Sequence, residues 1–135
     1  MITAVDTSVL LDVFGEDPAF LERSLSALRR ALADGPLVAC DVVWAEVIAA
    51  FGDTETATRA LDRIPVEFSA SASEAAAAAG SAWRGYRAGG GPRTRVVADF
   101  LVGAHALEQA DRLLTRDRGF HRTAFKGLAI VDPTD

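Results

Sequence analysis

Short apolar runs alternate along the chain with longer segments that have the periodicity of helices. The apolar runs predict five strands, at residues 2–5, 37–40, 66–68, 112–114 and 128–131. The segments between them predict helices at residues 17–32, 41–51, 54–63, 71–87 and 97–109. Strands that alternate with helices form a parallel sheet with helices on both faces. We therefore expect an α/β fold with three layers, α/β/α, around a central, mostly parallel sheet of four to five strands.

Several local signals mark where the predicted helices begin. Asp17 and Pro18 are typical of a helix start, because aspartate caps the first turn and proline tolerates its first position. Asp41 is expected to cap the next helix in the same way. The sequence from Ser71 to Glu74 matches a capping box. At 135 residues we expect one domain, residues 1–135.

Two aspartates come directly after predicted strands. Asp6 follows the first strand, and Asp117 follows the fourth. If these strands are neighbours in a parallel sheet, both carboxylates lie at the same edge. Ligand sites of such sheets lie beyond the carboxyl ends of the strands, at the point where the strand order reverses. The two residues are therefore candidates for a functional site.

Two further acids occupy unusual places on predicted helices. Glu46 falls within the apolar stripe formed by Val43 and Val47, so we expect it to point inward and to need a partner. Asp99 lies near the start of its helix, and Gly103 leaves space one turn later. The simpler alternative is that Asp6, Asp99 and Asp117 are helix caps, and that Glu46 reaches solvent or pairs with an arginine.

Composition narrows the class of protein. The formal net charge is −5, so the whole molecule is not expected to attract nucleic acid or an anionic membrane, and any polyanion needs a local basic patch or bound cations. The single cysteine, Cys40, excludes an internal disulfide and is expected to be buried. We find no signal peptide and no apolar stretch long enough for a membrane span, and we expect a cytoplasmic protein.

Four segments, in this order, resemble the PIN-domain nucleases, and in particular the VapC-type toxins of bacterial toxin–antitoxin pairs. They are AVDTSVLLD, VWAEV, ADFLVGAHALEQ and LLTRDRGF, and they span nearly the whole chain. The resemblance implies a PIN-like fold for the three-layer domain. It assigns the family's acidic residues to Asp6, Glu46, Asp99 and Asp117. Many relatives carry one more acid in the last segment, where this chain has Gly119.

The resemblance implies an endoribonuclease that depends on Mg²⁺ or Mn²⁺. Carboxylate oxygens suit these cations, and a bound cation activates water and neutralises phosphate charge. Zinc would call for cysteine and histidine, and His105, His121 and Cys40 have no ligand spacing, so both histidines are interpreted as structural or surface groups. We expect Asp6 and Asp99 to be the main ligands, completed by Glu46 and Asp117.

The family's two hydroxyl residues next to the site map to Ser8 and Thr115, which would orient carboxylates from behind the ligands. Because crowded carboxylates repel one another, we also expect Mg²⁺ or Mn²⁺ to stabilise the fold.

The resemblance also implies partners: an RNA substrate, a VapB-type antitoxin whose tail covers the acidic cleft, and a second copy of the chain in a homodimer. Arginines around the glycine run could bind RNA phosphates, or could only keep a loop soluble; they are Arg87, Arg93 and Arg95. Trp44 and Trp83 could stack on bases, or fill the core or a subunit interface.

The main alternative is a catalytically silent PIN-like module that binds RNA or protein without cutting it. The four acids argue against that alternative. A phosphatase of the haloacid dehalogenase type would need a second aspartate where the chain has Ser8.

Overall fold

The computed structural model describes residues 1–90 and 94–135. Its centre is a sheet in which every pairing between neighbouring strands is parallel. The strand order is β3-β2-β1-β4-β5. The strands are β1 (Thr3–Val5), β2 (Leu37–Cys40), β3 (Val66–Ser69), β4 (Arg112–Leu114) and β5 (Ile130–Val131).

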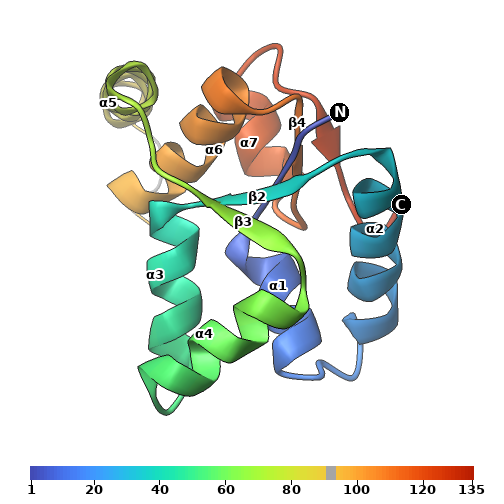
Figure 1. The fold of residues 1–135 in the computed structure, drawn as a ribbon. Coiled ribbons are helices and arrows are strands. Elements are labelled where there is room, and N and C mark those ends of the chain that lie inside the picture. The colour runs from blue at the N-terminus through green and yellow to red at the C-terminus, as the bar shows by residue number, and fades with distance from the viewer. Residues whose placement is uncertain (91–93) are drawn as a thin grey trace.

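Helices cover both faces of this sheet, as Figure 1 shows. The helices α1 to α4 lie on one side, and α5 to α7 lie on the other. Their bounds are α1 (Thr7–Phe14), α2 (Leu21–Asp34), α3 (Asp41–Ala50), α4 (Thr54–Arg63), α5 (Ser73–Ala88), α6 (Val97–Gln109) and α7 (Arg118–Ala124). The predicted three-layer α/β/α fold with a parallel sheet is confirmed.

Two short helices were not expected from the sequence. The helix α1 begins directly after β1, because Asp6 adopts an extended conformation and its carboxylate accepts a hydrogen bond from the Thr7 N–H. The helix α7 follows β4 by only a few residues. Both helices are shorter than the window over which apolar periodicity becomes visible, and this explains why the pattern did not indicate them.

Three predicted helix caps were wrong. The Asp17 carboxylate accepts hydrogen bonds from the next loop residues, at positions 19 and 20, and α2 begins only at Leu21. Asp41 is the first residue of α3 and not its cap, and its carboxylate accepts hydrogen bonds from Ser71. The Ser71 hydroxyl is therefore not part of a capping box, and α5 begins without a side-chain cap.

The core is apolar on both faces of the sheet. On one face it is built by α1 to α4, with side chains such as Leu10, Leu28 and Leu61 fully or almost fully buried. On the other face, Phe100 of α6 packs against alanines of α5 and against Phe125. Burial of this apolar surface is the main stabilising contribution to the fold. Within the described ranges, none of the helices is both long and apolar enough to cross a membrane.

The burial of His105 in this core is expected to make the stability of the fold depend on pH. Its side chain is 1% exposed, and its Nε2 lies 2.9 Å from the Ser69 Oγ. Burial lowers the pKa of His105 below its ordinary value, although the charge of Asp41 opposes this. The unfolded chain therefore binds a proton at a higher pH than the folded chain does.

We expect stability to be lost as the pH falls from about 6.5 toward the lower pKa of the folded state. A His105→Gln variant should lose less stability over the same pH range, as measured by urea unfolding at pH 7.5 and pH 5. Parallel losses in the two proteins would show that His105 does not contribute to the pH dependence.

Candidate functional site

The candidate site lies at the point where the strand order reverses. The chain moves from β1 to β2 on one side, and it later returns to β4 on the other side of β1. Val5 is paired with Leu114, so the residues that follow these two strands emerge side by side. The carboxyl ends of β1 and β4 therefore form the crevice in which ligands of such sheets bind.

Thr115 joins the two aspartates at this edge. Its hydroxyl donates a hydrogen bond of 2.6 Å to Asp6 Oδ2 and accepts one of 2.9 Å from the Asp117 N–H. Thr115 is completely buried. A single side chain therefore fixes Asp6 relative to the loop that carries Asp117, while the role of Thr115 behind metal ligands stays a prediction.

The surroundings of Asp6 favour the ionised carboxylate. Burial by itself raises the pKa of Asp6, but contacts with His121, Thr115 and the Thr7 N–H outweigh it, so the pKa lies below the ordinary value. His121 Nε2 lies 3.8 Å from Asp6 Oδ2, and the His121 side chain is 2% exposed. Interpreting His121 as a structural group missed this proximity, because the two residues are far apart in sequence.

Glu46 differs from the prediction. Val43 and Val47 are buried as expected, but Glu46 is exposed and not part of an inward apolar stripe. Its Oε1 accepts a hydrogen bond of 2.8 Å from the Thr7 hydroxyl. Because Thr7 follows Asp6 directly, this contact holds the exposed glutamate of α3 at the end of β1.

Asp117 already forms an ion pair with an arginine side chain. Both of its oxygens accept hydrogen bonds from the guanidinium of Arg95, one of them at 3.1 Å. The hydrogen bonds to Asp117 are the main reason why the pKa of Arg95 is raised, and the charges of Asp117 and Asp99 raise it further. Asp99 itself is in the first turn of α6, where its Oδ2 accepts a hydrogen bond from the Val96 N–H. Arg95 therefore pairs with Asp117 and lies within electrostatic range of Asp99.

The four acids share one edge of the molecule without forming a compact cluster. Across residues 1–90 and 94–135, no group of three or more His, Cys, Asp and Glu side chains is placed to hold a metal ion. The donor chemistry nevertheless fits Mg²⁺ or Mn²⁺, since the acids and hydroxyls offer only oxygen. The Ser8 hydroxyl, two residues after Asp6 in the sequence, is buried and has no hydrogen-bond partner among the described residues, which leaves a polar atom for a further contact.

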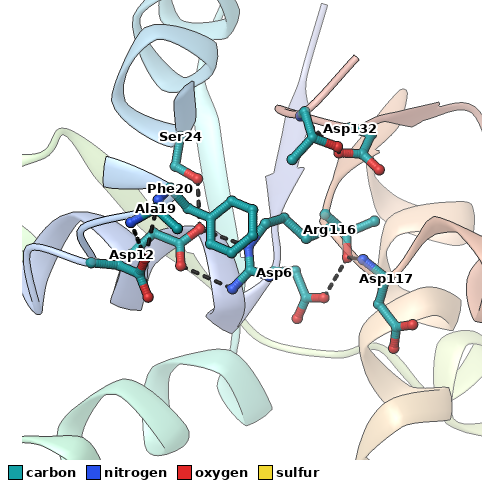
Figure 2. Close-up of polar contacts among 11 residues, drawn as sticks. Asp6, Asp12, Ala19, Phe20, Ser24, Arg116, Asp117 and Asp132 are labelled. Atoms are coloured by element: carbon teal, nitrogen blue, oxygen red, sulfur yellow. Dashed lines mark hydrogen bonds and ion pairs between the residues drawn. The ribbon is translucent and has the colours of Figure 1, made fainter. Parts of the chain in front are cut away.

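An ion pair behind the site was not found from the sequence. Arg116 forms two hydrogen bonds to Asp12, of 2.8 and 2.9 Å, and Ser24 donates a third of 2.7 Å to the same carboxylate. Figure 2 shows these contacts beside Asp6 and Asp117. The Arg116 guanidinium also lies 4.0 Å from the centre of the Phe20 ring.

A signal for this pair was present in the sequence. Asp12 is 3% exposed and lies in an otherwise apolar run, so the argument used for Glu46 applies more strongly to Asp12. Because Arg116 separates Thr115 from Asp117, its anchoring on α1 and α2 fixes the loop that carries both site residues.

Three predicted residues remain, namely Arg87, Arg93 and Trp44. Arg87 is exposed, with its guanidinium 5.1 Å from the centre of the Trp83 ring. Arg93 lies outside the described residues. Trp44 packs edge-on against Phe68.

The fold and the site together define a class of protein: a parallel α/β/α domain with acids at the switch point between β1 and β4. The family model described as "PIN domain" matches residues 3–126. The chain therefore belongs to the PIN domain family, and the membership predicted from the four segments is confirmed.

Solved structures of toxin–antitoxin complexes share this fold. A chain of VapBC2 from Rickettsia felis, bound to a promoter DNA fragment, has a TM-score of 0.76 and 18% identity, with 98% of each chain covered. A chain of VapBC-1 from nontypeable Haemophilus influenzae has the same TM-score and identity, with both chains fully covered. A chain of FitAcB from Neisseria gonorrhoeae has a TM-score of 0.69 and 18% identity over 99% of each chain. No curated protein sequence is significantly similar to this chain.

Proposed function

We propose that this protein is a metal-dependent endoribonuclease that acts as the toxin of a VapBC-type toxin–antitoxin pair. The observation that carries the proposal is the link from Asp6 through Thr115 to Asp117 at the switch point of a PIN domain. The fold shared with chains of VapBC and FitAB complexes supports the toxin role.

In this proposal the metal is Mg²⁺ or Mn²⁺, held by Asp6 and Asp99 with Glu46 and Asp117. When bound, such a cation lowers the pKa of water and neutralises charge on phosphate oxygens. The low pKa of Asp6 keeps its carboxylate ionised and ready to bind a cation. Thr115 fixes the orientation of Asp6. The role of Ser8 in orienting a carboxylate stays a prediction, because its hydroxyl has no hydrogen-bond partner among the described residues.

Asp117 can join the metal site only if it exchanges Arg95 for the cation. A carboxylate that already has a bidentate guanidinium partner is neutralised and offers fewer lone pairs. Arg95 would then be released toward the end of α5, with its charge available to the substrate.

The proposed partners follow from the family and from the neighbours of similar fold. We expect an antitoxin that covers the acidic edge and a homodimer as the free toxin. RNA is the expected substrate, and Arg87, Arg93 and Arg95 are expected to contact its phosphates. The expected location is the cytoplasm. The pairing of Arg95 with Asp117 is the one observation that favours the alternative, a PIN-like module that binds RNA or protein without cutting it.

The test is RNA cleavage by the purified protein freed of any antitoxin. Total RNA should be cut in Mg²⁺ or Mn²⁺, should stay intact in EDTA, and should be cut again when excess Mn²⁺ is added back. Cleavage that continues unchanged in EDTA would contradict the metal-dependent mechanism. Metal binding without cleavage of transfer, ribosomal or messenger RNA would favour the silent module.

A further inference from the structure

We infer that the groove at the carboxyl end of α5 binds a single strand of RNA, with a base stacked on Trp83 and phosphates held by Arg84 and Arg87. The inference rests on the proposed function, since it says how the same site receives its substrate.

The groove has a volume of about 920 Å³. It is lined mainly by two aromatic residues and three arginines: Trp83, Tyr86, Arg84, Arg87 and Arg95. Each charged residue among the described lining residues is an arginine, although the whole chain carries a net charge of −5. A local basic groove of this kind is what an acidic protein needs in order to hold a polyanion.

Trp83 provides a surface for a base. Its side chain is half-buried against the α5–α6 core, so the ring is held in place while part of it faces the groove. Arg87 lies over this ring, with its guanidinium 5.1 Å from the centroid, so a base that stacks on the ring takes the place of this guanidinium and leaves it to bind a phosphate. Bases of single-stranded nucleic acid stack on such aromatic rings and on guanidinium planes.

Arg95 connects the groove to the acidic edge. The same guanidinium lines the groove, pairs with Asp117 and lies 4.3 Å from the centre of the Phe120 ring. A strand that occupies the groove therefore has a phosphate next to Arg95, which lies between the groove and Asp117.

The combination of groups favours single-stranded RNA over other polyanions. An acidic peptide would use the arginines but not the face of Trp83. In a duplex the base faces are covered by neighbouring bases, so a duplex offers nothing that could stack on Trp83.

The experiment uses the full chain in EDTA, so that binding is measured without cleavage. The chain has two tryptophans, and a Trp44→Phe background leaves Trp83 as the only fluorescent indole. An oligouridylate of about ten nucleotides should quench this fluorescence in a saturable way. An Arg84→Gln, Arg87→Gln double variant should weaken binding at least about tenfold and reduce the slope of log K against log salt by about 1.4, since two phosphate contacts are lost.

The matched control is an Arg23→Gln, Arg29→Gln double variant, with the same change of charge on exposed residues of α2. This helix lies away from α5 in Figure 1. The control should bind as the parent does.

Three results would overturn the inference: no quenching by the oligouridylate, an equal loss of binding in the control, or equal binding of a polyglutamate peptide or an RNA duplex. Cleavage in Mn²⁺ without any response of Trp83 would refute the groove and leave the nuclease standing. Quenching without cleavage in Mn²⁺ would support the groove and refute the proposed nuclease activity.

Discussion

Replacing Asp6 with asparagine is expected to reduce RNA cleavage by at least about a hundredfold. Loss of a residue that only supports a metal ligand already costs 10- to 100-fold, and Asp6 is the carboxylate on which Thr115, Thr7 and His121 converge. Asparagine has nearly the same shape and lacks the charge that attracts a cation. Initial rates with a labelled RNA in Mn²⁺ would measure the loss.

The variant should also lose its response to metal. Wild-type protein is expected to melt at a higher temperature in millimolar Mn²⁺ than in EDTA, because a ligand that binds only the folded state stabilises it. Asp6→Asn should melt at the same temperature in both conditions. Asp62→Asn, an exposed acid on α4, is the control and should behave as the wild type. Full cleavage by Asp6→Asn would return Asp6 to the role of a helix cap.

Breaking the buried Asp12–Arg116 pair is expected to lower the free energy of unfolding much more than breaking an exposed ion pair would. Arg116→Met removes two hydrogen bonds and leaves a carboxylate that is 3% exposed with only the Ser24 hydroxyl. An unpaired buried charge costs about 3–5 kcal/mol. The free energy of unfolding from urea denaturation would measure this loss. Cleavage should fall as well, since Arg116 anchors the loop between Thr115 and Asp117.

Two controls distinguish the cost of leaving a buried charge unpaired from the cost of replacing an arginine as such. Arg59→Met breaks an ion pair with Glu55 in which both side chains are mostly exposed, so its cost should be at most about 1 kcal/mol. Asp12→Leu combined with Arg116→Met removes both charges of the pair and should recover much of the stability lost in the single variant. If Arg116→Met costs no more than Arg59→Met, the pair does not anchor the fold.

The sequence alone determined most of the fold. The bounds of β2, α4, α6 and β4 agree with the pattern to the residue. Each of these elements has a local cause: a short apolar run for a strand, or an apolar stripe for a helix. The alternation of strands and helices then required a parallel sheet, because parallel strands need a crossover connection. That same logic placed Asp6 and Asp117 at one edge on the condition that their strands are neighbours, and the pairing of β1 with β4 meets this condition.

Only the tertiary structure decided which groups the acids contact. The apolar pattern of its helix predicted that Glu46 points inward, but the packing of α3 leaves it exposed and brings Thr7 to it. Arg95 and Asp117 are 22 residues apart, and Asp12 and Arg116 are 104 apart. No local pattern predicts such pairs, because a side chain's partner depends on how the strands and helices pack together. The chain's periodicity therefore specified its elements and the edge at which a site forms. The packing of those elements decided the long-range partners of the acids, which are Thr115 for Asp6, Thr7 for Glu46, Arg95 for Asp117 and Arg116 for Asp12.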